Sequence, residues 1–344
     1  MKAAVLTQIG KPLEIQDLPE PAPGPGEMLV KVRSSGICGS DLHWASIPPG
    51  LPAGTVMGHE FSGEVVALGP EAGDRFAVGE RICSVPFIGC GRCAACLSGD
   101  VTTCDASAPI GLGVNGGAYA EYLRVGVNEA LRLPEDVSDR KGALVEPLAV
   151  GLHAVKKARL APGARSLVIG AGPIGLATAL WARFFGAAAV VVSEKAAARR
   201  DLSARFGATE VIDPGAEEAG PRFAELAGGP PDVVFECVGV PGLIQECVGL
   251  VRPRGLVVVV GVCMQPDTIL PGVAVMKEVG VQFVVAYEKQ DFDFTLAMLD
   301  ARRIASEEMV TDVVGFDRFS QAFEALKQPS TQCKVILEPQ ESGG

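Results

Sequence analysis

The sequence predicts an α/β protein of two domains, one rich in β-structure and one built around a parallel sheet, from three observations. The chain has 344 residues, about twice the length of a usual domain. Its 42 glycines and 25 prolines, with only 6% aromatic residues, favour a loop-rich α/β protein over a helical bundle. From Ala161 onward, short apolar runs alternate with helical stretches, which is the pattern of a parallel sheet with both faces covered.

The first 150 residues have the pattern of an irregular antiparallel β domain. Short β-like runs at 28–33 and 64–68 are separated by turn signals at 23–26 and 48–50, which are rich in proline and glycine. Such punctuation is typical of short strands joined by turns. We therefore expect residues 1–150 to form the first domain.

The second domain is expected at 151–287, because strand-like runs and helical stretches alternate there. The strand-like runs lie at 166–169, 189–193, 232–236, 256–260 and 282–286. A C-terminal segment, 288–344, follows it. This segment contains expected helices near 292–301 and 319–326 and a last strand at 334–337.

The acidic balance of the chain argues against several classes of partner. A formal net charge of -11 provides no basic surface for nucleic acid and should repel an anionic membrane. The N-terminus has no sustained apolar stretch, and the longest apolar run, 256–263, is far too short to span a bilayer. We therefore expect a soluble, cytoplasmic protein. In that reducing compartment, clustered cysteines suggest a metal rather than disulfides.

Four of the ten cysteines form a cluster with the spacing of metal ligands. Cys90, Cys93, Cys96 and Cys104 follow the pattern C-x2-C-x2-C-x7-C. Gaps of two residues let neighbouring sulfurs converge on one ion, and four thiolates close a tetrahedral shell around Zn²⁺. Because such a shell leaves no open position, we expect a structural zinc. The alternatives are disulfides or unrelated free thiols.

A glycine-rich turn follows the first strand-like run of the second domain. The segment 170–175 reads GAGPIG and lies between the strand-like run 166–169 and a helical stretch at 176–185. This is G-x-G-x-x-G in the context that a dinucleotide site requires, with the helix N-terminus offering N–H groups to phosphates. The alternative is a glycine-rich surface turn. The expected cofactor-binding residues are Gly170, Gly172, Pro173, Ile174 and Gly175.

Glu194 lies at the end of the next strand-like run, 19 residues after Gly175. An acid there can accept hydrogen bonds from the hydroxyls of the adenosine ribose and would repel a 2′-phosphate, so the sequence favours NAD over NADP. Three basic residues follow Glu194 and could weaken the preference for NAD over NADP, namely Lys195, Arg199 and Arg200.

A second set of candidate metal ligands is scattered along the first domain. A catalytic zinc needs about three protein ligands and one exchangeable position. Cys38, His59 and a carboxylate from Glu60 or Glu146 would meet that need. Asp41 is a candidate to orient the imidazole of His59. Taken singly, however, such residues are more often core cysteines, surface carboxylates or structural histidines, and spacing alone does not bring them together.

These motifs, in this order, resemble those of the zinc-containing medium-chain dehydrogenases/reductases, the alcohol dehydrogenase superfamily. The matching segments are GICGSDLH at 36–43, GHE at 58–60, the cysteine cluster, VEPLAV at 145–150 and GAGPIG at 170–175. The similarity covers essentially the whole chain. Alcohol dehydrogenases proper carry a cysteine at the position of Glu146. A glutamate there resembles the branch of sorbitol, butanediol and threonine dehydrogenases.

The resemblance implies a GroES-like β domain that carries two Zn²⁺ ions, one catalytic and one structural, and a Rossmann domain that binds NAD. The C-terminal segment should return to complete the first domain. Cys38 and His59 match zinc ligands, and Glu60 matches an acid that binds the metal or exchanges with water. Glu146 occupies the third-ligand position, so which glutamate binds zinc stays open. The family also implies a homodimer or homotetramer, associated through Rossmann edge strands near 282–286.

The resemblance assigns further roles, each with a plainer alternative. Ser40 matches a hydroxyl in contact with the substrate oxygen, and His43 matches a relay imidazole. Otherwise Ser40 is a turn residue and His43 a capping or stacking residue. Val238 and Gly239 fall where the adenosine ribose should lie, unless they simply end a strand. Lys334 occupies a position near the cofactor phosphates, unless it is an ordinary edge-strand lysine.

The sequence thus predicts a zinc-dependent enzyme that transfers hydride between a secondary alcohol or polyol and NAD, without nucleic-acid or membrane partners. Oxidation of an amino alcohol, as in threonine 3-dehydrogenases, is an alternative. A zinc-free reductase and a non-catalytic NAD- or zinc-binding protein are disfavoured, because both metal sets, Ser40 and His43 are present. Trp44 and Ile47 suggest an apolar substrate pocket.

Overall fold

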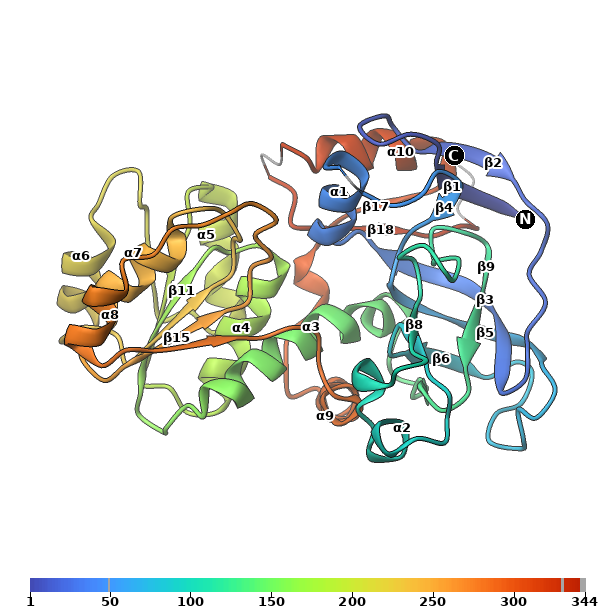
Figure 1. Cartoon of the computed structure of the whole chain (residues 1–344), viewed down its shortest axis with the longest axis horizontal. Helices are drawn as coiled ribbons and strands as arrows, with labels where there is room; N and C mark the ends of the chain where they lie inside the picture. The colour runs from blue at the N-terminus through green and yellow to red at the C-terminus, as the bar shows by residue number, and fades with distance from the viewer. Residues whose placement is uncertain (49, 329–330, 341–344) are drawn as a thin grey trace. The chain divides into compact units, whose positions relative to one another are not determined.

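The computed structural model describes residues 1–48, 50–328 and 331–340, which fall into two compact units (Figure 1). The first unit joins Met1–Glu146 to Glu288–Gly344, and the second is Pro147–Tyr287. The first unit is built on mostly antiparallel sheets, and the second on a single parallel sheet. The predicted α/β class is therefore confirmed.

The main sheet of the first unit has seven strands. Its order is β10 (Ala130–Arg132), β6 (Arg81–Ser84), β5 (Glu60–Leu68), β3 (Glu27–Gly36), β18 (Lys334–Leu337) and β17 (Val310–Val314), with β9 (Tyr122–Gly126) added on β3. All its pairs are antiparallel except β17–β18. Because β18 lies between β3 and β17, the C-terminal segment supplies an interior strand of this sheet.

Smaller elements surround the main sheet of the first unit. A three-stranded sheet contains β2 (Glu14–Asp17), β1 (Lys2–Leu6) and β4 (Thr55–Val56), and a two-stranded sheet contains β7 (Phe87–Ile88) and β8 (Ala108–Pro109). The α-helices are α1 (Gly39–Ser46), α2 (Ala94–Ser98), α9 (Lys289–Asp300) and α10 (Phe316–Ala325), with 3-10 turns η1 (Val101–Thr103) and η3 (Glu307–Met309). The long helix α3 (Asp139–Ala158) begins in this unit.

Helix α10 shows how the sequence pattern builds the core of the first unit. Phe316, Phe319 and Phe323 recur at helical spacing and are all buried, so one face of the helix packs inward. Phe319 and Phe323 lie beside the ring of Tyr119, in a cluster that also contains residues of β1 and β18. A second cluster lies over β3 and β5 and includes Val30.

The second unit contains one sheet of six parallel strands. Its order is β13 (Glu210–Ile212), β12 (Ala189–Ser193), β11 (Arg165–Ile169), β14 (Val233–Glu236), β15 (Leu256–Val259) and β16 (Gly280–Phe283). The helices are α4 (Pro173–Phe184), α5 (Ala197–Ser203), α6 (Ala219–Ala227), α7 (Leu243–Leu250) and α8 (Pro271–Lys277), with a 3-10 turn η2 (Ala204–Phe206). The order reverses at β11, as in doubly wound dinucleotide-binding folds.

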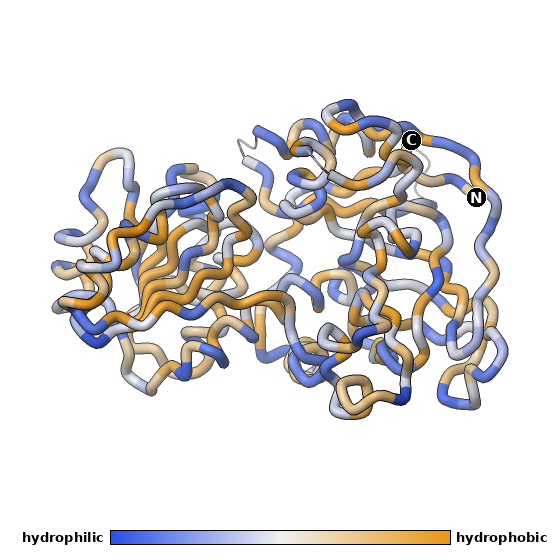
Figure 2. The backbone as a smooth tube through the Cα atoms, viewed as in Figure 1, coloured by the Kyte–Doolittle hydropathy of each residue, from blue (hydrophilic) through white to orange (hydrophobic). Residues whose placement is uncertain are grey.

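The strands of this sheet are apolar along nearly their whole length, as the orange stretches of the second unit in Figure 2 show. In β14, all four residues are buried. Continuous apolar strands are expected where helices cover both faces of a parallel sheet. Helix α4 packs on β11 and β12, and α7 packs on β14 and β15.

Most predicted elements of the second unit are confirmed, with two differences at their ends. Helix α4 begins three residues earlier than predicted, because Gly172 is its N-cap and Pro173 occupies the first turn, where proline costs no hydrogen bond. The strand predicted at 282–286 is wrong at its end. The structure has Gly280–Phe283, and the extended conformation is lost by Ala286, whose φ is 51°. Within the described residues, no helix is both long and apolar enough to cross a membrane.

Candidate metal centres and cofactor site

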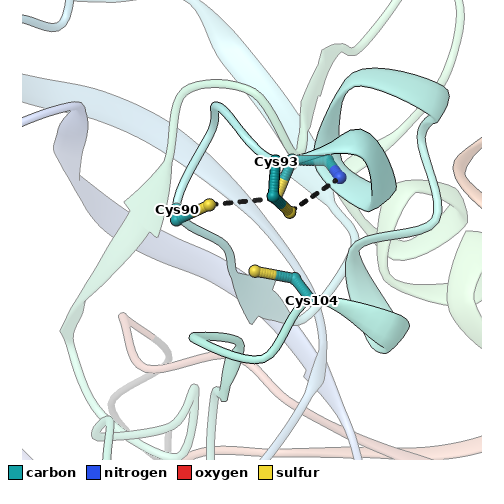
Figure 3. Close-up of side chains that lie close together, drawn as sticks. Cys90, Cys93 and Cys104 are labelled. Atoms are coloured by element: carbon teal, nitrogen blue, oxygen red, sulfur yellow. Dashed lines mark hydrogen bonds between the residues drawn. The ribbon is translucent and has the colours of Figure 1, made fainter.

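The four clustered cysteines lie on the loop between β7 and β8. Cys93 is the N-cap of the short helix α2, and its sulfur accepts a hydrogen bond from the backbone N–H of Cys96 at 3.5 Å. The next turn, η1, leads directly to Cys104. The loop thus folds back on itself, and Figure 3 shows the side chains of Cys90, Cys93 and Cys104 pointing toward one another.

The sulfur spacing in this cluster fits a four-cysteine zinc site. The Cys93 and Cys96 sulfurs are 3.6 Å apart, and those of Cys90 and Cys96 are 3.9 Å apart. A tetrahedral ion with Zn–S bonds of about 2.3 Å places its sulfurs about 3.8 Å apart, whereas a disulfide requires about 2.05 Å. Backbone N–H groups of Arg92 and Cys93 lower the pKa of Cys90 to about 6, whereas burial raises the pKa of Cys96 to about 12, so Cys90 ionises more readily than Cys96.

A second group is formed by Cys38, His59 and Glu60, whose ligand atoms all lie within 4.8 Å of one another. Antiparallel pairing of β3 with β5 sets Gly36 opposite Glu60. Cys38 lies two residues after the end of β3, and His59 directly precedes β5. The sheet therefore brings together residues that spacing alone could not join. This upper limit on the separations is compatible with ligands about 2.0–2.3 Å from one ion.

Asp41 lies behind His59 and is fully buried. Its Oδ1 faces His59 Nδ1 at 3.3 Å, and neither atom has a hydrogen-bond partner that meets strict geometry in the described part of the chain. Burial alone would lower the pKa of His59, but Asp41 and then Cys38 raise that pKa well above its ordinary value. These partners favour positive charge at the imidazole, which is the charge that a metal ion supplies.

Tyr119 completes this arrangement, although no sequence motif marks it. Its hydroxyl donates a hydrogen bond to Asp41 Oδ2. The backbone N–H of Cys38 donates to the same oxygen at 3.3 Å. Burial and the neighbouring Asp41 carboxylate raise the pKa of Tyr119 well above its ordinary value, so the phenol keeps its proton and acts as the donor.

Lys334 is the second unexpected member of the site. Its ammonium donates to both oxygens of Glu60 at 2.6 Å and to the carbonyl oxygen of Ile37 at 2.9 Å. The residue is 1% exposed. These three oxygens match the three hydrogens of the ammonium group. The edge-strand alternative is wrong, because Lys334 lies on the interior strand β18, and the role of Lys334 near cofactor phosphates stays a prediction.

Glu146 is buried on α3 but does not join the group of Cys38, His59 and Glu60 at its short spacing, as far as the described residues go. It is near enough that its charge helps to raise the pKa of Lys334, against the lowering effect of burial and behind the larger effect of Glu60. The structure therefore sets Glu60 nearest to the other ligands and Glu146 further out.

Ser40 and His43 lie on α1, the helix for which Cys38 is the N-cap. Both are half-buried. Residues three apart on a helix share a face, so the two side chains follow one another along the helix that begins at a metal ligand. No contact between them is recorded, and their roles stay a prediction.

The glycine-rich turn joins β11 to α4 in the second unit. Gly170 has a φ of 93°, which glycine adopts without strain, and its N–H donates to the carbonyl oxygen of Ser193. A Cβ on Gly175 would lie 1.9 Å from the carbonyl oxygen of Gly170, so only glycine fits there. Gly172, Pro173 and Ile174 form the start of α4. The exposed N–H groups at this helix start are suited to a pyrophosphate.

Glu194 lies directly after β12, beside this turn. Its two oxygens accept hydrogen bonds from the backbone N–H groups of Ala171 at 2.7 Å and Ala196 at 2.8 Å. The carboxylate is thus held in place with lone pairs to spare. Of the nearby basic residues, Arg200 is paired with Asp213 at 2.9 Å, so its charge is partly satisfied.

Val238 and Gly239 follow β14 and lie at the same end of the sheet. A Cβ on Gly170 would lie 2.6 Å from the side chain of Val238, so Val238 lies against the glycine-rich turn. Both backbone N–H groups donate to one oxygen of the buried Glu236, at 2.7 and 2.8 Å. Glu236 is a positioning residue that the sequence reading missed, because an acid at a strand end has no distinctive motif.

Comparison with known proteins gives the family. Residues 24–135 match the family described as the alcohol dehydrogenase GroES-like domain, and residues 173–301 match the family described as zinc-binding dehydrogenase. A sorbitol dehydrogenase of Halalkalibacterium halodurans is 32% identical, with 98% of this chain and 99% of that protein covered. The (R,R)-butanediol dehydrogenase of Bacillus subtilis is 32% identical over 96% and 97% of the two chains.

Solved structures agree with these relatives. A 2R,3R-butanediol dehydrogenase from Bacillus subtilis superposes with a TM-score of 0.88 at 31% identity, over 98% of this chain and 99% of that one. The chain therefore belongs to the zinc-containing medium-chain alcohol dehydrogenase superfamily. It is an oxidoreductase that acts on alcohols with zinc and a nicotinamide cofactor.

Proposed function

We propose that the protein is a zinc-dependent, NAD-linked dehydrogenase that interconverts a secondary alcohol or polyol with its ketone. The observation that carries this proposal is the group of Cys38, His59 and Glu60, whose ligand atoms lie within 4.8 Å of one another. A thiol, an imidazole and a carboxylate are a donor set that suits zinc. Three protein ligands leave a fourth position for substrate, as catalytic zinc sites require.

The residues around this group have separate tasks. Bound there, zinc supplies Lewis acidity that lowers the pKa of a substrate hydroxyl, and the nicotinamide accepts the hydride. Asp41 orients His59 through Nδ1. Ser40 accepts the hydroxyl proton from the substrate and passes it to His43, which releases it to solvent.

We propose Glu60 as the third ligand. It is the carboxylate that lies with Cys38 and His59, and it is buried. A carboxylate has about four lone-pair sites, so Glu60 can bind a metal while Lys334 holds it from the other side. Glu146 then acts from further out, on the water or substrate side of the group.

We propose a second zinc at Cys90, Cys93, Cys96 and Cys104, in a structural role. The sulfur separations of 3.6 and 3.9 Å support it. We propose NAD as the cofactor because Glu194 is fixed beside the glycine-rich turn, where a carboxylate favours ribose hydroxyls over a phosphate. One similar structure, 31% identical, is bound to NADP, and another, 28% identical, to NADH, so the cofactor has to be measured.

The proposed substrate class is supported by the relatives, which include the sorbitol and butanediol dehydrogenases and an L-threonine 3-dehydrogenase of Aeromonas hydrophila, 32% identical over 93% of this chain and 94% of that one. Ile47 is partly exposed, and its apolar side chain favours an apolar secondary alcohol as the substrate. A polyol and an amino alcohol are the alternatives.

The test combines metal analysis with a substrate screen. We expect about two zinc ions per chain and NADH formation with a secondary alcohol such as butanediol or cyclohexanol. If sorbitol is turned over fastest, the substrate is a polyol and the proposal of an apolar alcohol is wrong. If threonine is turned over fastest, the substrate is an amino alcohol. One zinc per chain with no dehydrogenase activity would contradict the proposed catalytic centre.

A further inference from the structure

Tyr119 lies at the junction of the elements that carry the proposed catalytic metal ligands. It is 0% exposed. Its ring lies 4.8 Å from the ring of Phe319 and 6.3 Å from that of Phe323, centroid to centroid. The surroundings of the ring are thus apolar, and a phenylalanine would fill them as well. The hydroxyl therefore needs a separate explanation, because a polar group in such a core costs free energy unless it is hydrogen-bonded.

The backbone and ring of Tyr119 support the loop that ends in His59. Its N–H donates to the carbonyl oxygen of Met57 at 2.9 Å. Gly58 has a φ of 98°, and a Cβ on it would lie 2.6 Å from the Tyr119 ring. The loop therefore adopts a conformation in which Gly58 makes room for the ring and His59 follows at once.

The hydroxyl of Tyr119 acts on the other side of His59, through Asp41. It donates to Asp41 Oδ2, which also accepts the N–H of Cys38 at 3.3 Å. With Oδ2 occupied, the second oxygen, Oδ1, is the one that faces His59 Nδ1 at 3.3 Å. A proton on Nδ1 then leaves Nε2 as the nitrogen that can bind a metal.

We propose that Tyr119 is a positioning residue for the catalytic metal, which fixes Asp41 so that His59 presents Nε2 to the ion. This inference rests on the proposed function, since it needs a metal at Cys38, His59 and Glu60. A hydrogen bond between a phenol and a carboxylate is stronger than one between neutral groups. Loss of a partner that orients a ligand costs about 10–100-fold in metal affinity.

The test is the Tyr119→Phe variant of the full-length protein, which keeps the ring and removes only the hydroxyl. Metal affinity is measured by chelator competition with Zn²⁺, and the catalytic ion is followed by Co²⁺ absorption. We expect the affinity of one of the two ions to fall by about 10–100-fold. The ion at the cysteine cluster should keep its affinity, and excess zinc should restore the turnover number.

Two control variants separate positioning from stability. Tyr122→Phe removes a hydroxyl from β9, outside this network, and should leave both affinities unchanged. Phe319→Leu disturbs the same aromatic cluster without touching Asp41. It should lower the melting temperature while leaving metal affinity within about threefold, on the usual spread of such effects.

The outcomes are distinguishable. Equal metal affinity in Tyr119→Phe and the unmodified protein, with two ions bound in each, would overturn the role of Tyr119 and leave the proposed function intact. A matching loss of affinity in Phe319→Leu would also overturn it, because the effect would then follow stability. Only one ion bound by the unmodified protein would overturn both proposals together.

Discussion

At the scale of single residues, the buried pair of Glu60 and Lys334 determines how the proposed Glu60 ligand can be tested. Both side chains are at most 1% exposed, and their charged atoms are 2.6 Å apart. Removing one partner of a buried pair costs about 3–5 kcal/mol, because an uncompensated charge remains. A ligand test that replaces Glu60 alone would therefore mix metal loss with misfolding, and the pair has to be replaced as a unit.

We expect the double variant Glu60→Gln/Lys334→Met to lose the catalytic zinc while keeping its fold, because both buried charges leave together. Glu146→Gln should keep two zinc ions and lose turnover by about 10²-fold, within the range of a group that assists proton transfer. Zinc content and kcat measure these outcomes, with circular dichroism as the control for folding. Loss of zinc in Glu146→Gln alone would make Glu146 the third ligand.

Glu194 gives a second prediction at this scale. Glu194 accepts hydrogen bonds from two backbone N–H groups. Glu194→Gln removes the negative charge and keeps one oxygen that can accept one of these hydrogen bonds. Since hydrogen bonds to charged groups contribute about 1.5–3 kcal/mol, we expect kcat/KM with NAD to fall about 10–100-fold and that with NADP to rise. Glu210→Gln, an exposed change on the adjacent β13, is the matched control. An unchanged ratio of the two cofactors would exclude Glu194 as the selector.

At the scale of elements, the sequence predicted the helices, strands and loops that depend on residues close together in the chain. The glycine-rich turn, the strands of the parallel sheet and the cysteine loop all follow from neighbours in sequence, and the structure has each at or near its predicted position. That Cys38 and His59 lie together was expected only from the resemblance, and the pairing of β3 with β5 that joins them was not predicted. Tyr119 and the Glu60–Lys334 pair could not be predicted, because a contact across 274 positions leaves no local pattern.

The cysteine loop carries the prediction that belongs to this scale. From Cys90 to Cys104 it spans about 15 residues, and a cross-link that closes such a loop contributes about 3 kcal/mol. For units of this size that is about 6–12 °C in melting temperature. We expect Cys93→Ser to lose one zinc and to melt lower by about that amount, as measured by calorimetry. Cys263→Ser, which lies outside the loop, should change neither; a stable Cys93→Ser with full zinc would contradict the structural site.

At the scale of the whole molecule, the second unit has an exposed sheet edge at which another copy of the chain could bind. Strand β16 pairs with β15 on one side only, within the described chain, and Phe283 is 64% exposed. Val285 and Met276, on either side of β16 in the sequence, are 82% and 86% exposed. An apolar, unpaired edge strand tends to pair with another chain. We propose that two copies of this chain associate here, with their β16 strands antiparallel about a two-fold axis.

Light scattering coupled to size exclusion should therefore show a dimer, or a tetramer if a second interface exists. Phe283→Lys with Val285→Lys should lower the oligomer to the next smaller species, because two charges on each copy would be buried against their symmetry mates. Val78→Lys, which is 63% exposed in the first unit, is the matched control and should keep the oligomer. A monomer in the unmodified protein at micromolar concentration would contradict the interface, as would an unchanged oligomer in the double lysine variant. Because the metal ligands lie in the first unit and the edge in the second, the variant should keep its two zinc ions, and this separates loss of association from loss of fold.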